Sequence, residues 1–173
     1  MTVEAQSDLP VHYCGAAIIF ATNVGPITRA AIKNAIAMWN KALGMSYLPD
    51  PIDFVPSNDD YARIVIAGWP SNEGRKRFVG LTQFTVNPIT GCFGATIYIY
   101  PRMSTGYIYS VARHELGHIL GLPDSPYEGD LMYMMDPWAY HPYPITELES
   151  LWARQIAGLE EVKMNGGRDE EEN

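Results

Sequence analysis

Two histidines and a glutamate lie close together in residues 114–124, which read HELGHILGLPD. On a helix, residues four apart lie one turn apart on the same face, so His114 and His118 can both point to one metal ion. Glu115 is then placed beside the ion, where it can take a proton from a metal-bound water. The spacing therefore predicts a helix that carries two metal ligands and a general base.

Gly121 and Asp124, which follow the second histidine, complete a candidate metal site. Gly121 can adopt a left-handed backbone conformation that other residues resist, so the helix can end there and the chain can turn back. Asp124 then returns toward the same ion as a third ligand. Three protein ligands with one open position are typical of a catalytic zinc site, so we expect one catalytic Zn²⁺.

Other residues compete with Asp124 for the third ligand position. His12 and His141 are the only other histidines, and His141 is the rival on spacing. A glutamate such as Glu128 or Glu147 is the other alternative, as in HExxH hydrolases of the gluzincin type. The simplest alternative to any metal site is an amphipathic helix with two partly exposed histidines and a surface glutamate.

The segment from Val111 to Tyr133 resembles the metzincin metallopeptidases, and within them the matrixin-like branch. That family has the pattern HExxHxxGxxH followed by a turn that contains a methionine. Asp124 departs from the pattern, because most members have histidine there; an aspartate is similar to snapalysin-type members. The residues that match position by position are His114, Glu115, His118, Gly121 and Met132.

The resemblance implies a fold and an activity. The fold would be α+β (α/β-like): a metzincin or zincin fold with a twisted, mixed five-stranded sheet, two helices, an active-site helix, a methionine turn and a C-terminal helix. The activity would be that of a zinc-dependent endopeptidase, in which a metal-activated water attacks a peptide bond with Glu115 as general base. Met132 would form a packed turn beneath the metal without binding it.

Two segments are candidates for contact with a peptide or protein substrate. By the resemblance, the strand at 80–86 borders the cleft as an antiparallel edge, and an extended peptide can pair with such an edge. The segment after the methionine would form an apolar pocket. The strand residues are Leu81, Thr82, Gln83 and Phe84, and the pocket residues are Tyr133, Met134, Met135, Trp138 and Tyr140. The alternatives are an ordinary edge strand and a loop packed on the last helix.

Three function classes remain open at this point. The first is the zinc endopeptidase, the second is an HExxH hydrolase with a different third ligand, and the third is a non-catalytic metal-binding or peptide-binding domain on the same scaffold. Glu115 argues against the third class, because a domain that only binds has no need of a proton carrier.

Length and composition are those of a small globular protein. The chain has 173 residues, of which 47% are apolar, enough for one domain with a core. We expect an N-terminal extension over 1–10, a metzincin-like catalytic domain over 11–162 and an acidic disordered tail over 163–173.

The net charge is −8, and the last 14 residues, with six acidic and two basic side chains, carry half of it. Without a basic stripe, no nucleic-acid partner is expected.

The sequence gives limited information on location and assembly. No apolar run is long enough to span a membrane, and the first ten residues lack the basic and apolar regions of a signal peptide. We therefore expect no membrane partner, a monomer, and a protein that acts inside the cell or leaves by another route or after processing. Cys14 and Cys92 can form one disulfide or remain two buried thiols, and Cys14 is expected to be structural.

Periodicity predicts the elements that must position these residues. Strands are expected at 13–22, 52–55, 61–68, 80–86 and 94–100, and the metal-binding helix at 105–120. A first helix would be capped by Thr28 and end at Gly44; its apolar stripe is Ile32, Ile36, Trp39 and Leu43. Thr146 and Glu149 form a capping box that opens a last helix. The apolar face of that helix is Leu148, Leu151, Trp152, Ile156 and Leu159.

Overall fold

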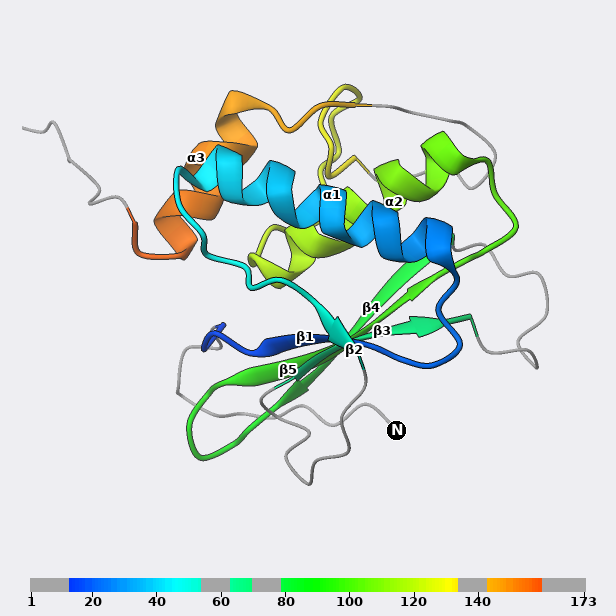
Figure 1. The fold of residues 1–173 in the computed structure, drawn as a ribbon. Helices are drawn as coiled ribbons and strands as arrows, with labels where there is room; N and C mark the ends of the chain where they lie inside the picture. Colours follow the sequence, from blue (N-terminus) through cyan, green and yellow to red (C-terminus); the bar gives the residue numbers. More distant parts are fainter. Residues whose placement is uncertain (1–12, 54–62, 70–78, 134–142, 160–173) are drawn as a thin grey trace, which may run out of the picture.

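A computed structural model describes residues 13–53, 63–69, 79–133 and 143–159. Its described residues form one five-stranded sheet, in the order β2-β1-β3-β5-β4, with three helices on one side of it (Figure 1). The mixed α+β class and the five-stranded mixed sheet that the sequence predicted are therefore confirmed. The strands are β1 (Ala17–Phe20), β2 (Ile52–Asp53), β3 (Arg63–Gly68), β4 (Gly80–Val86) and β5 (Phe93–Ile99).

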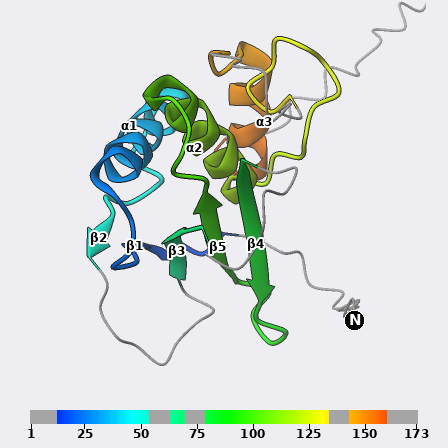
Figure 2. The ribbon, with the colours of Figure 1, turned by 90° about the vertical axis from the view of Figure 1, so that its right-hand side faces the viewer.

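The sheet is parallel except at one edge. β1 pairs in parallel with β2 and β3, and β3 pairs in parallel with β5. β4 pairs antiparallel with β5 over its whole length, from Gly80 opposite Ile99 to Val86 opposite Phe93. Figure 2 shows β4 at the edge of the sheet nearest α3. The antiparallel edge strand expected at 80–86 is thus present.

The first helix, α1 (Pro26–Leu43), begins three residues earlier than the sequence predicted. Gly25 is the residue before the first turn, and Pro26 starts the helix because its fixed φ suits that position. Thr28 is therefore not the cap; it lies inside the helix and is buried. At the other end Gly44 is left-handed, with φ 75°, as expected. The predicted apolar stripe is buried against the sheet and α2.

The second helix, α2 (Thr105–Ile119), carries the candidate metal ligands and lies against α1. Ser104 caps it by accepting a hydrogen bond from the Tyr107 backbone N–H. Trp39 of α1 is fully buried, and its indole N–H donates to the Arg113 carbonyl oxygen at 2.9 Å. This bond fixes α2 directly beside His114, so α1 serves as the support on which the ligand-bearing helix rests.

The last helix, α3 (Glu147–Ile156), has the predicted capping box but does not bury its apolar face. The side chains that face inward are Glu149 and Ala153. Those expected on the apolar face are largely exposed: Leu148, Leu151, Trp152 and Ile156. The prediction failed because a bond from Glu149 to another part of the chain, and not the apolar periodicity, decides which side of α3 points inward. Leu159, beyond the helix, packs partly against the core.

A disulfide joins Cys14, before β1, to Cys92, before β5. This settles the alternative that the sequence left open in favour of one disulfide. The bond connects the chain before β1 to the start of β5, the strand that pairs with β4.

No described helix is long and apolar enough to cross a membrane. The two expected terminal segments, 1–10 and 163–173, lie outside the described residues.

Removing the disulfide is expected to lower the stability of the protein. The bond closes a loop of 78 residues, so its loss frees the unfolded chain of a long-range constraint. The double variant Cys14→Ser/Cys92→Ser should lose about 2–5 kcal/mol of unfolding free energy, measured by urea denaturation. An unchanged denaturation midpoint would show that the bond contributes nothing to the fold.

Candidate metal centre

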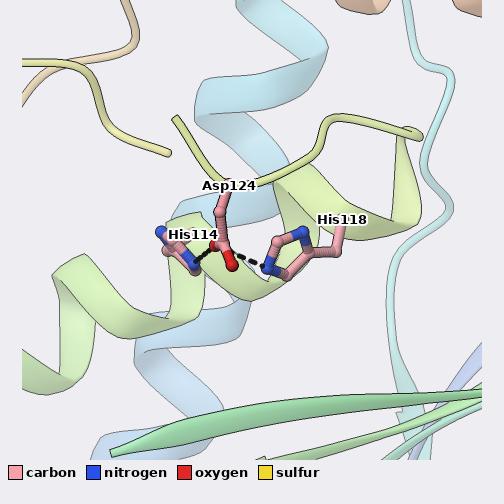
Figure 3. Close-up of side chains that lie close together, drawn as sticks. All are labelled: His114, His118 and Asp124. Atoms are coloured by element: carbon pink, nitrogen blue, oxygen red, sulfur yellow. Dashed lines mark ion pairs between the residues drawn. The ribbon is translucent and has the colours of Figure 1, made fainter. Parts of the chain in front are cut away.

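The two histidines of α2 point to the same place. His114 and His118 lie one turn apart, with ring centroids 4.8 Å from each other and ring planes perpendicular. His114 is buried, while His118 is partly exposed. Figure 3 shows both rings directed toward the carboxylate of Asp124. The helical spacing therefore brings the two ring nitrogens together as the sequence predicted.

Asp124 reaches the histidines because the chain reverses after α2. Gly121 has φ 87°, the left-handed conformation expected from the sequence. The turn is held by the Gly121 N–H, which donates to the His118 carbonyl, and by the Leu122 N–H, which donates to the Gly117 carbonyl. Asp124 Oδ1 then lies 3.2 Å from His114 Nε2 and 3.5 Å from His118 Nε2.

The geometry of these three side chains fits a metal ion. One nitrogen from each histidine and one oxygen of Asp124 all lie within 4.8 Å of one another. Ligand atoms bonded to zinc at about 2.0–2.1 Å in a tetrahedron lie roughly 3.3–3.4 Å apart, and the two Asp124 distances bracket that value. The Asp124 side chain is 53% exposed, so the centre is open to solvent on the side of the carboxylate. A fourth ligand can enter from that side.

Two backbone carbonyls hold the histidine rings from behind. His114 Nδ1 lies 3.0 Å from the Leu131 carbonyl oxygen, and His118 Nδ1 lies 2.9 Å from that of Leu122. A carbonyl oxygen can only accept, so both Nδ1 atoms must carry the proton. In the neutral form of each ring, Nε2 then directs its lone pair to the cluster, and this is the form that binds a metal. The sequence gave no sign of which residues supply these acceptors.

The charges in the cluster favour an ionised Asp124. The bond with His114 lowers the pKa of Asp124, although partial burial acts in the opposite direction. Burial by itself lowers the pKa of His114, but the bond with Asp124 and the neighbouring Glu115 charge outweigh it and raise the pKa. Without a metal, these shifts favour an ion pair between the Asp124 carboxylate and a protonated His114 ring, and a bound cation would displace that proton.

Glu115 lies against the edge strand. It is only 5% exposed, and its Oε2 accepts a hydrogen bond from the Thr82 hydroxyl at 2.6 Å. Gly80 lies so near that a Cβ there would overlap Glu115 Oε1. Burial raises the pKa of Glu115, and the Thr82 bond offsets part of that rise. The strand was expected to contact a substrate; that Thr82 also orients Glu115 could not be seen in the sequence, because the two are 33 residues apart.

Met132 lies beneath the ligand-bearing helix. Its side chain is buried, and its sulfur packs so closely on Gly117 that a Cβ at that glycine would overlap it. The Met132 carbonyl oxygen accepts a hydrogen bond from the Ser125 N–H at 2.6 Å. Ser125 follows Asp124 directly, so the methionine turn also holds the loop that carries the third candidate ligand.

The other predicted site residues are only partly described. On β4, Leu81 and Thr82 are half-buried, whereas Gln83 and Phe84 are exposed. Tyr133 is half-buried at the end of the methionine turn. The alternative ligands Glu128 and Glu147 are exposed and do not belong to the three-residue cluster. The remaining pocket residues and the rival ligand lie outside the described residues: Met134, Met135, Trp138, Tyr140 and His141.

No known protein-family model matches this chain, and no curated protein sequence matches it at a significant level.

Loss of Asp124 is expected to weaken zinc binding strongly. Removal of a residue that only supports a metal ligand costs about 10–100-fold in affinity, and removal of a ligand should cost more. Asp124→Ala should therefore bind zinc more than about 100-fold less tightly than the wild type, measured by competition with a chromogenic chelator. Glu128→Ala is the matched control, because it removes an exposed carboxylate from the same loop and should leave affinity unchanged. Normal zinc affinity of Asp124→Ala would exclude Asp124 as a ligand.

The bond between Thr82 and Glu115 should be measurable as a coupling energy in the metal-free protein. Hydrogen bonds to charged groups contribute about 1.5–3 kcal/mol, so a double-mutant cycle of Thr82→Val and Glu115→Ala should give a coupling in that range. Thr85→Val, on the exposed part of the same strand, should show none with Glu115→Ala. A coupling near zero for Thr82 as well would mean that the two side chains do not interact in solution.

Proposed function

We propose that this protein is a zinc-dependent endopeptidase. The observation that carries the proposal is the convergence of His114, His118 and Asp124, with the buried Glu115 next to the first of them. Three protein ligands with an open fourth position are characteristic of catalytic zinc, whereas structural zinc has four protein ligands.

The residues divide the chemistry between them. Bound zinc would supply a Lewis acid that polarises the peptide carbonyl and lowers the pKa of water. Glu115 would accept the proton of the attacking water and pass it to the nitrogen of the leaving amine. Thr82 occupies one lone pair on Glu115 Oε2 and leaves the rest of the carboxylate free to receive that proton.

The order and pairing of elements support the resemblance to metzincins. A parallel sheet with one antiparallel edge strand precedes the helix with the two histidines, and a buried methionine turn and a last helix follow it. Of the described strands, only β5 pairs with β4, so the outer edge of β4 is a site where an extended peptide can add as a further strand. The substrate class would be a peptide or protein, and the enzyme would act as a monomer.

Asp124 would give this centre a different charge from a three-histidine site. A carboxylate adds one negative charge, whereas an imidazole adds none, so the centre carries about one less positive charge. We therefore expect a somewhat weaker Lewis acid, and a metal preference that extends further toward ions that favour oxygen ligands.

Replacement of the general base should abolish hydrolysis without loss of metal. Glu115→Gln keeps the shape of the side chain but cannot accept the proton, so cleavage of denatured casein should fall by about 10²–10⁴-fold. The zinc content, measured on the same samples by atomic emission, should stay at one ion per chain.

The exposed Glu128→Gln is the control for a general loss of charge, and it should cleave at the wild-type rate. A wild-type protein that binds zinc and cleaves nothing would favour a non-catalytic metal-binding domain. Undiminished cleavage by Glu115→Gln would show that another group moves the proton.

A further inference from the structure

A buried carboxylate on α3 is connected to the first metal ligand through a single peptide group. Glu149 is 3% exposed, and its Oε1 accepts a hydrogen bond from the Met132 N–H at 2.7 Å. That N–H belongs to the peptide group whose carbonyl is Leu131 C=O. The same carbonyl accepts the hydrogen bond from His114 Nδ1 at 3.0 Å. Glu149, one peptide group and the His114 ring therefore form a continuous chain of hydrogen bonds.

The two oxygens of Glu149 have separate tasks. Oε2 accepts from the Thr146 N–H and from the Thr146 hydroxyl, both at 2.8 Å, and completes the capping box of α3. Oε1 takes no part in the cap and is directed to Met132. A capping box needs only one of the oxygens. The capping box therefore accounts for the position of Oε2 and leaves the Met132 bond unexplained.

A negative charge at the N–H end of a peptide group strengthens the carbonyl as an acceptor. The charge polarises the amide, and hydrogen bonds in such a chain reinforce one another, more so in a buried site. A stronger acceptor holds the proton of His114 on Nδ1 more firmly, fixes the ring, and makes Nε2 a better electron donor to a metal.

The second histidine lacks this connection and provides a contrast within the same molecule. The acceptor for His118 Nδ1 is the carbonyl of Leu122, which is followed by Pro123. Proline has no N–H, so no carboxylate can polarise the Leu122 carbonyl in this way. The two ligand rings have the same kind of partner at almost the same distance, but only one of these partners is linked to a buried charge.

We propose that Glu149 is a positioning residue for the metal centre, acting on His114 through the Leu131–Met132 peptide group and leaving His118 unaffected. The proposal rests on the metal centre of the proposed function, but it does not depend on peptide hydrolysis. It gives a role in the site to a residue of the last helix that lies 35 positions from the histidine it orients.

The test compares three variants by nitrogen NMR of the histidine rings, in the metal-free protein and with zinc. Glu149→Gln removes the charge but keeps the shape and one acceptor oxygen. Glu147→Gln removes the same charge from the same turn of α3 at an exposed position. Thr146→Ala weakens the cap of α3 but leaves the Oε1 bond to Met132 in place. The unfolding free energy of each variant is measured alongside.

Only Glu149→Gln should change the His114 ring. Its Nδ1 proton signal should move upfield and exchange faster with water, while that of His118 stays in place. Zinc affinity, from chelator competition, should fall by about tenfold, the lower end of the range for loss of a residue that supports a ligand. Glu147→Gln should match the wild type in all these measurements, and Thr146→Ala should lose stability without a change at His114.

Two outcomes would overturn the proposal. In the first, Glu149→Gln shifts both histidines equally or neither of them. In the second, Thr146→Ala reproduces the His114 change, which would reduce Glu149 to a helix cap. If Glu149→Gln does not fold, the wild-type protein alone can test the proposal. Addition of zinc should move the NMR signal of the Met132 amide proton downfield. An unmoved signal would contradict a link between Glu149 and His114 through this peptide group. A wild type that binds no zinc would refute the proposed function, while the metal-free ring spectra would still test the link from Glu149 to His114.

Discussion

The methionine turn is the constraint on which the candidate centre depends. Its Leu131 carbonyl holds the ring of His114, and its Met132 carbonyl holds the N–H that follows Asp124. Its Met132 side chain packs under α2 at Gly117. Two of the three candidate ligands are therefore positioned by two consecutive residues, and the third, His118, is held by the turn that follows its own helix. Backbone carbonyls therefore fix both imidazole rings and the chain next to Asp124.

The rest of the fold keeps that turn and α2 in register. α1 fixes α2 from one side through the bond from Trp39 to Arg113, and β4 meets it from the other side through Thr82 and Glu115. The disulfide ties the strand next to β4 to the chain before β1. α3 is joined to the turn by the buried Glu149. The helices and the sheet edge thus surround the centre, and its exposed side is the one at Asp124.

The features of this site that could be predicted from the sequence are those set by residues only a few positions apart. The helical period brought His114 and His118 together, and the conformational freedom of Gly121 allowed Asp124 to return. The capping box of α3 was readable for the same reason, because its two residues are three apart. The order of the strands in the sheet could be predicted only roughly, from the alternation of elements and the family resemblance.

The parts that could not be predicted depend on contacts between distant segments. The carbonyls behind the histidines carry no side-chain signature, and any residue type can supply one. From the sequence, Thr82 was predicted only as a strand residue and Glu149 only as part of a helix cap. Their bonds to Glu115 and to the Met132 N–H depend on how β4 and α3 pack on the rest of the chain. The inward side of α3 was mispredicted on the same ground, since burial of one hydrogen-bonded carboxylate outweighed an apolar period.

The most direct test of the account is the X-ray absorption spectrum of the zinc-loaded protein. Two imidazole nitrogens and one or two oxygens, all at roughly 2.0–2.2 Å and without sulfur, are the coordination that His114, His118 and Asp124 predict. A shell made of oxygen alone, with no scattering from imidazole rings, or a sulfur at about 2.3 Å, would contradict it.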